Sequence, residues 1–237
     1  MAEPIPHRMN TFSSPDALAE ALANRCAEAL RTAIKARGAA SIAVSGGSTP
    51  GRFFEALSRK ELDWTRVIVT LVDERFVPPS SERSNERLVR ERLLTNEARL
   101  ARFVALYSAV DTAETAAAQS EAGLALLGPN LDIVVLGMGT DGHTASYFPD
   151  ADEFEAALDP DQRRRVLAIH APSAVEPRLT LTLPTVVGAR FLALHIEGRE
   201  KQRLLQRAVE SDQTLPIARV MAAAGRPVDV FWAPNEG

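Results

Sequence analysis

Cysteine, aromatic side chains and long apolar runs are all scarce in this sequence of 237 residues. The single cysteine, Cys26, excludes an internal disulfide and favours a reducing compartment. Aromatic residues make up 5% of the chain, so a core has to be built from Ala, Val, Leu and Ile. Hydrophobic residues nevertheless reach 46%, which predicts one packed globular domain over residues 1–237.

An excess of positive charge is missing too. The net charge is −4 and the isoelectric point is about 5.7, so we expect no nucleic-acid partner, because a backbone binder needs a basic surface. No apolar run is long enough for a membrane span, and MAEPIPHRMN lacks the apolar stretch of a secretory signal. We therefore expect a cytoplasmic protein without a membrane partner, either a monomer or a small homo-oligomer.

Short apolar segments alternate with helical patterns along the whole chain. This alternation predicts an α/β fold: a doubly wound, Rossmann-like, mainly parallel sheet with helices on both faces. The expected strands are 41–45, 67–72, 131–136, 165–170, 191–196 and 228–232, with a further candidate at 103–107. Because 165–172 lies close to the segment RLTLTLP at 178–184, we also expect a small antiparallel edge.

The expected helices are about 15–37, 50–59, 86–94, 111–127, 199–210 and 216–223. The first has the clearest boundaries, since Ser14 can cap its start, Pro15 suits its first turn and Gly38 can end it. One face of this helix carries a ladder at i, i+4 spacing: Leu18, Leu22, Cys26, Leu30 and Ile34. Cys26 is therefore expected in the core and not as a nucleophile.

A glycine-containing turn follows the first expected buried strand, in the segment SGGSTP. Gly46 and Gly47 let the backbone approach an anion closely, and the helix that follows offers free N–H groups. Ser45, Ser48 and Thr49 can add hydroxyl groups. The segment predicts a phosphate cradle, although a tight turn with a Ser or Thr cap explains it as well. It is neither a Walker A loop nor a GxGxxG motif.

Two carboxylates and an arginine stand at the end of the next strand, in VDERFVPP. Asp73 or Glu74 could orient a sugar hydroxyl, and Arg75 could offer its fork of donors to substrate oxygens. A local ion pair at a strand end is an equally good explanation of this segment taken alone.

The loop GMGTDGHTAS follows the third buried strand. Histidine is the side chain best suited to accept a proton near neutral pH, and His143 stands two residues after Asp141. Open α/β sheets bind ligands beyond the carboxyl ends of their strands, so we expect this loop and the two segments above to share one pocket. A surface histidine in a flexible loop is the alternative.

The other polar residues give weaker signals. His7, His170 and His195 are expected to be structural, the first in an N-terminal tail and the others in strand patterns. No spacing of His, Cys or carboxylates matches a metal site, so we predict no metal. No GxSxG motif of a serine nucleophile is present either. Taken alone, Arg178 and Lys201 are ordinary solvated charges.

Together these segments resemble the glucosamine-6-phosphate isomerase/6-phosphogluconolactonase family. The pieces that carry the resemblance are AVSGGSTP, LVDERFVP with SN at 84–85, DIVVLGMGTDGHTASYFPD, RLTLTLP and IEGREK, which span residues 43–201. The resemblance implies hydrolysis of 6-phospho-D-glucono-1,5-lactone to 6-phosphogluconate, a step of the oxidative pentose phosphate pathway, with no cofactor. The partner it implies is this small phosphorylated lactone.

The resemblance also implies roles for individual residues. The 45–49 segment would hold the 6-phosphate, with Arg178 and Lys201 as counter-charges. Arg75 would bind substrate oxygens near the reacting end, and His143 would be the general base that activates water, with Asp141 shaping its loop.

Two alternatives stay open. The isomerase/deaminase branch of the family shares the DGH element but has a glutamate before the proline that follows it, where this chain has Phe148. A phenylalanine cannot relay a proton, which favours the lactonase, and Asp73 is then structural or substrate-orienting. A sugar-phosphate sensor without catalytic activity is the other alternative, disfavoured by the intact Asp141 and His143 pair.

Overall fold

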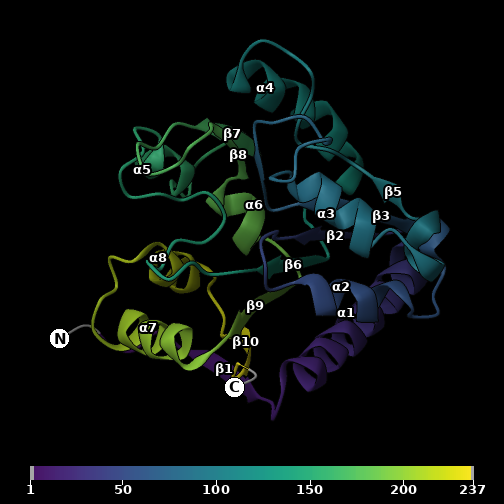
Figure 1. The fold of residues 1–237 in the computed structure, drawn as a ribbon, viewed down its shortest axis with the longest axis horizontal. Helices are drawn as coiled ribbons and strands as arrows, with labels where there is room; N and C mark the ends of the chain where they lie inside the picture. Colours follow the sequence, from purple (N-terminus) through teal and green to yellow (C-terminus); the bar gives the residue numbers. More distant parts are fainter. Residues whose placement is uncertain (1–2, 236–237) are drawn as a thin grey trace.

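Two β-sheets organise residues 3–235, the part of the chain that the computed structural model describes (Figure 1). The larger has seven strands in the order β1-β10-β9-β6-β2-β3-β5, all parallel, and the smaller has three antiparallel strands in the order β4-β8-β7. The strands are β1 His7–Thr11, β2 Ala40–Val44, β3 Val67–Leu71, β4 Asp73–Arg75, β5 Arg102–Phe103, β6 Ile133–Leu136, β7 Val166–Ile169, β8 Arg178–Leu181, β9 Phe191–Glu197 and β10 Val228–Ala233.

Eight α-helices connect these strands within the described residues. They are α1 Pro15–Arg37, α2 Gly51–Ser58, α3 Asn85–Arg92, α4 Ala113–Leu124, α5 Phe154–Ala157, α6 Leu183–Val187, α7 Arg199–Glu210 and α8 Pro216–Ala223. Three short 3₁₀ turns, Trp64–Arg66, Asn96–Leu100 and Ala125–Leu127, complete the connections. The expected α/β class, mainly parallel sheet and small antiparallel element are confirmed.

The direction in which the chain winds decides where a ligand fits. From β1 through β2 and β3 to β5 the chain steps across the sheet one way, and from β6 through β9 to β10 it steps the other way. Because parallel crossovers are right-handed, the helices of the two halves cover opposite faces of the sheet. The reversal falls between the adjacent strands β2 and β6, so a crevice opens beyond their carboxyl ends.

Helix α1 forms as its sequence predicts. Ser14 accepts a hydrogen bond from the Ala17 amide at 3.2 Å, and Gly38 ends the helix in a left-handed conformation with φ of 80°. Its apolar ladder faces the sheet, and Cys26 is fully buried there. Burial raises the pKa of the Cys26 thiol far above its ordinary value, which keeps it protonated and unreactive.

The segment VIVTLVDE, expected as one strand, divides between the two sheets. β3 ends at Leu71, and β4 begins at Asp73 and pairs with β8. Val72 joins them, since its amide donates to Val44 at 2.9 Å and its carbonyl accepts from Leu181 at 2.8 Å. This switch carries Asp73 and Arg75 away from the large sheet and onto the rim of the crevice.

Several expected elements are corrected by the structure. The strand expected at 165–170 is β7, which lies in the small antiparallel sheet and not in the parallel one. The strand at 103–107 is reduced to Arg102–Phe103. His7 begins β1 and does not lie in an irregular tail. The segment HRMNT has no apolar pattern that predicts a strand, because backbone pairing with β10 holds it at the edge of the sheet.

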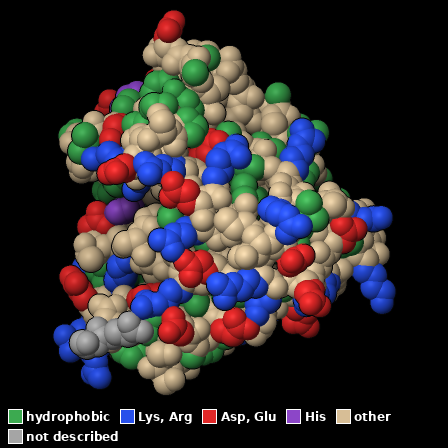
Figure 2. Space-filling view, turned by 45° about the vertical axis from the view of Figure 1, so that its right-hand side comes forward, with side chains coloured by type: hydrophobic (Ala, Val, Ile, Leu, Met, Phe, Trp, Pro, Cys, Tyr) green, Lys and Arg blue, Asp and Glu red, His purple; other side chains and the backbone are tan. Residues whose placement is uncertain are grey.

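The surface matches the interleaved charges of the sequence. Figure 2 shows Lys and Arg side chains intermixed with Asp and Glu over the face in view. No helix within residues 3–235 is long and apolar enough to cross a membrane.

Candidate active site

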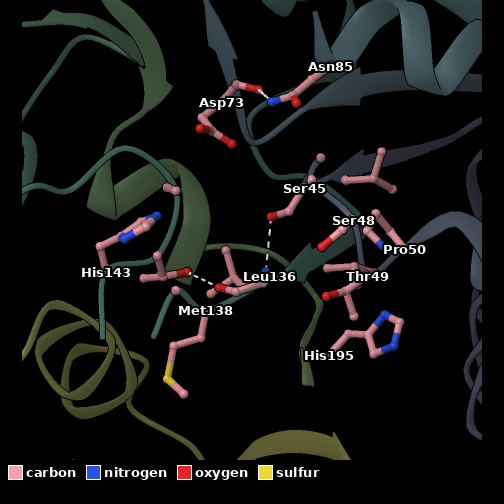
Figure 3. Close-up of a pocket in the computed structure, with 18 of the residues that line it drawn as sticks. Ser45, Ser48, Thr49, Pro50, Asp73, Asn85, Leu136, Met138, His143 and His195 are labelled. Atoms are coloured by element: carbon pink, nitrogen blue, oxygen red, sulfur yellow. Dashed lines mark hydrogen bonds between the residues drawn. The ribbon is translucent and has the colours of Figure 1, made fainter. Parts of the chain in front are cut away.

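A pocket of about 410 Å³ opens beyond the carboxyl ends of the parallel strands, at the point where the winding reverses. All of the segments singled out from the sequence contribute to its wall. The lining includes Ser45, Gly46, Gly47, Ser48, Thr49, Asp73, Arg75, Asp141, His143, Arg178 and Lys201. Residues spread over more than half of the chain therefore meet at one site (Figure 3).

The 45–49 loop is packed so that its backbone faces the pocket. Ser45 Oγ accepts from the Gly137 amide at 3.1 Å and so ties this loop to the one after β6. A Cβ on Gly46 would lie 1.9 Å from Asn85 Oδ1, so only glycine fits there, and Gly47 has a φ of 94° that also favours glycine. Within the described residues, the amides of Gly46, Gly47 and Ser48 donate to no protein acceptor. Successive free amides before a helix suit an anion.

Asp141 and His143 form a hydrogen-bonded pair in the loop after β6. His143 Nδ1 lies 2.6 Å from Asp141 Oδ1, and the His143 amide donates to the same oxygen at 3.2 Å. Burial raises the pKa of Asp141, but the charge of His143 and its hydrogen bonds outweigh burial and hold that pKa below its usual value. The carboxylate therefore stays ionised and favours a proton on Nδ1, which leaves Nε2 as an acceptor.

The loop backbone and the neighbouring ring of Phe148 hold this pair in place. A Cβ on Gly139 would lie 2.4 Å from two ring atoms of His143, so the pair rests directly on a glycine. The Gly142 carbonyl accepts from the Ile217 amide at 3.1 Å, which docks the loop on the first turn of α8. The His143 ring also contacts Phe148, with centroids 4.8 Å apart. These contacts fix where the imidazole lies.

Arg75 and Arg178 bring two guanidinium groups to the same wall. The Nε–H of each is buried and has no hydrogen-bond partner in the structure. Arg75 also donates through Nη1 to the Arg83 carbonyl, and Arg178 lies 5.6 Å above the ring of Phe148. Burial lowers the pKa of the Arg178 guanidinium, yet arginine stays charged at any physiological pH. Unpartnered Nε–H donors on a buried and a half-buried arginine suit an anionic ligand.

The two carboxylates of VDERFVPP have different environments. Asp73 lines the pocket and accepts from Ser146 Oγ at 2.7 Å. Glu74 points the other way and is fully buried, accepting from Ser84 Oγ and from the amides of Asn85 and Glu86 at 2.7–3.0 Å. Glu74 is thus a structural anchor for α3, which leaves Asp73 as the carboxylate that can contact a ligand.

Several lining residues were missed by the sequence analysis. Asn85 lines the pocket and is held by its side-chain bond to the Asp73 carbonyl at 2.8 Å; its only sequence signal was the SN pair. Ser173 also lines the pocket, where its amide donates to Asp150 Oδ2, and no sequence pattern pointed to it. His195 was expected to be purely structural, but it contributes to the wall; a polar residue near the carboxyl end of a buried strand was the available signal.

The other two histidines lie elsewhere. His7 bonds to the Ile5 carbonyl, and His170 follows β7 and contacts Glu153 and Glu114. Among residues 3–235, no group of three or more His, Cys, Asp or Glu side chains is arranged to hold a metal ion.

The fold and the pocket correspond to one class of proteins. Residues 13–232 match the family described as glucosamine-6-phosphate isomerases/6-phosphogluconolactonase. The chain belongs to this family, as its motifs predicted.

Individual relatives lie within one branch of that family. The chain is 54% identical over 228 residues to a 6-phosphogluconolactonase of Rhizobium meliloti, covering 95% of this chain and 98% of the relative. It is 39% identical to a 6-phosphogluconolactonase of Pseudomonas putida, covering 98% and 95%. A crystal structure of a 6-phosphogluconolactonase from Shewanella baltica superposes with a TM-score of 0.94 at 41% identity, covering 98% of this chain and 100% of that one.

Proposed function

We propose that this protein hydrolyses 6-phospho-D-glucono-1,5-lactone to 6-phosphogluconate. The observation that carries the proposal is the Asp141–His143 pair, with 2.6 Å between its atoms, in one pocket with an anion cradle. The names of the relatives, which are similar over nearly the whole chain, support the same activity.

The phosphate of the substrate would bind at the 45–49 loop. Its free amides and hydroxyls can surround phosphate oxygens, and the N-terminus of α2 adds a favourable dipole. Lys201 lies at the start of α7 in the same pocket wall, and Arg178 brings a second positive charge. Such contacts give a phosphorylated sugar an advantage over a neutral one.

His143 would act as the general base. Asp141 holds Nδ1, so Nε2 is left with the lone pair that can take a proton from water. The water oxygen would then bond to the lactone carbonyl carbon, and collapse of the tetrahedral intermediate would break the ring C–O bond. The same imidazolium can return the proton to the leaving ring oxygen, which regenerates the neutral imidazole, and the carboxylic acid product then releases its proton to water.

Charge on the carbonyl oxygen would be stabilised by Arg75. Its Nε–H is buried and unpartnered, so a developing oxyanion can accept a hydrogen bond from it without displacing an existing one. Donors arranged in advance typically contribute about 10²–10³ to turnover. A lactone is an activated ester, so these groups with a general base suffice in principle.

Isomerisation is the weaker alternative. At the position where the isomerase branch would need an acid relay next to His143, this chain places the ring of Phe148 at 4.8 Å between centroids. Asp73 is present, but it accepts a hydrogen bond from Ser146. The absence of a carboxylate at residue 148 favours hydrolysis.

The direct test is a lactonase assay coupled to 6-phosphogluconate dehydrogenase, with freshly generated lactone and subtraction of the spontaneous rate. Glucosamine 6-phosphate is offered to the same preparation in a parallel assay for fructose 6-phosphate. We expect lactone hydrolysis well above the spontaneous rate and no conversion of the amino sugar. A preparation that binds 6-phosphogluconate without accelerating hydrolysis would instead indicate a sensor.

A further inference from the structure

His195 has no role in the chemistry described above, although it belongs to the pocket. It lies near the carboxyl end of β9, is 3% exposed and lines the wall together with Thr49, Pro50 and Lys201. Figure 3 shows its imidazole beside Thr49 and Pro50, at the anion cradle and away from His143. A buried titratable group is therefore placed at the end of the pocket where an anion would bind.

One nitrogen of this ring is occupied and the other is not. Nε2 lies 3.2 Å from Oε1 of Glu197, and the ring stands edge-on to Phe53 with centroids 6.2 Å apart. Within residues 3–235, Nδ1 has no hydrogen-bond partner. The Glu197 carboxylate favours a proton on Nε2, so Nδ1 is a bare acceptor in the neutral ring and a donor in the protonated one.

The charges around His195 come from two elements. Glu197 belongs to its own strand, and Lys201 on α7 lies near Glu197, whose charge acts on the lysine. Helix α2 presents Phe53, the register neighbour on β10 is Phe231, and the 45–50 loop offers amides and hydroxyls. A bound phosphate dianion would add negative charge on the open side of the ring.

We propose that His195 is a proton-linked contact for the anion held by the 46–48 amides. On binding, the ring takes a proton from solvent and then donates from Nε2 to Glu197 and from Nδ1 to a phosphate oxygen. That this anion is the 6-phosphate of a sugar rests on the proposed function. The contact itself requires only a phosphate group.

Titration calorimetry of the full chain with 6-phosphogluconate tests this directly. Binding is measured in two buffers of different ionisation enthalpy from about pH 6 to about pH 8, which gives the number of protons taken up. The variant His195→Gln keeps a donor toward Glu197 and removes the titratable nitrogen. We expect the wild type to take up more protons than this variant, by up to about one per site. The wild type should bind 6-phosphogluconate about tenfold more tightly than the variant at about pH 6, and the two affinities should converge at about pH 8.

The controls separate this inference from a general loss of structure. His7→Gln changes the first residue of β1, at the amino ends of the parallel strands and outside the pocket lining, and should bind with the wild-type proton count. If His195→Gln unfolds at a lower temperature, Glu197→Gln serves as the second variant, because losing the carboxylate weakens protonation of His195 without removing the ring. It should also reduce proton uptake.

The outcomes distinguish this inference from the proposed function. The same titrations with inorganic phosphate test His195 without requiring the sugar. Equal proton uptake by the wild type and by both variants, with either ligand, would overturn the role of His195. Proton-linked binding of inorganic phosphate together with no binding of 6-phosphogluconate would overturn the proposed function and leave the His195 contact standing.

Discussion

Arg75 and Arg178 are register partners across the antiparallel pair of β4 and β8, so two guanidinium groups stand side by side in the pocket wall. Each has a buried Nε–H without a hydrogen-bond partner. Burial lowers the pKa of Arg178; the charge of Asp73 opposes this effect, and the charge of Arg75 adds to it less strongly than Asp73 opposes it. Burying the Arg178 guanidinium is unfavourable in the ligand-free protein. A bound anion would offset this cost, which would favour negatively charged ligands.

Replacing Arg178 should therefore separate stability from binding. We expect Arg178→Met to weaken 6-phosphogluconate affinity at least about tenfold, because one charge-assisted contact is lost. The midpoint of thermal unfolding without ligand should rise by about 2 °C, since a desolvated charge and an unpaired donor are removed. Calorimetry and thermal melts measure both quantities. Arg102→Met, on the exposed edge strand β5, is the matched control and should change neither. A large drop in melting temperature would show that Arg178 is structural.

His143→Asn should remove the general base and leave the fold intact. The side chain lies in a loop with 31% of its surface exposed, so its loss costs little packing. We expect turnover of the lactone to fall by about 10² or more, with KM changed far less. Near-normal turnover in a correctly folded variant would exclude the mechanism.

Gly139→Ala should also lower turnover, although it substitutes neither catalytic side chain. The new Cβ would lie 2.4 Å from the His143 ring and 2.6 Å from Asp141 Oδ1, so both side chains must move. They can swing toward solvent, so we expect turnover to fall about tenfold or more while the melting temperature changes little. Gly137→Ala is the control, since its Cβ meets nothing closer than Ser45 at 3.7 Å. Equal turnover in the two variants would argue against a fixed His143 geometry.

Lys201 should make phosphate binding sensitive to alkaline pH. Burial lowers the pKa of its ammonium group below the ordinary 10.5, so the positive charge is lost at a lower pH than in an exposed lysine. Affinity for 6-phosphogluconate, which is stable in alkali, should therefore weaken as the pH rises toward 10.5. Lys201→Arg should bind with a flat profile over this range, because a guanidinium does not titrate there. If affinity depended on pH in the same way in the two proteins, Lys201 would not be part of the phosphate site.

Glu74 is the anchor on which the β4 end of the pocket depends. Its carboxylate accepts four hydrogen bonds, from Ser84 Oγ and the amides of Arg75, Asn85 and Glu86. Glu74→Gln replaces one carboxylate oxygen with an NH2 group, which would face N–H or O–H donors and could not accept from them. We therefore expect the free energy of unfolding, measured with urea, to fall by about 1–3 kcal/mol. Glu91→Gln breaks only a surface pair with Arg87 and should stay within about 0.5 kcal/mol of wild type.

Local chemistry allowed much of this protein to be predicted from its sequence. Ser14, Pro15 and Gly38 predict where α1 begins and ends, because helix capping and a positive φ depend on the local sequence. The strands β2, β3 and β6 are predominantly apolar, since both faces of a parallel sheet are covered. The loops after them were recognisable because polar residues and glycines follow such strands abruptly.

Tertiary structure decided what the same residues do. Strand β1 could not be predicted because its stability comes from backbone pairing with β10, more than 200 residues away. Whether Asp73 or Glu74 faces the pocket depended on the switch between sheets at Val72. The juxtapositions of Arg75 with Arg178, of Gly46 with Asn85 and of His195 with the cradle join segments far apart in the chain. The sequence by itself determined the elements and their chemistry, which are local, whereas only the packing of the two sheets determined which side chains meet.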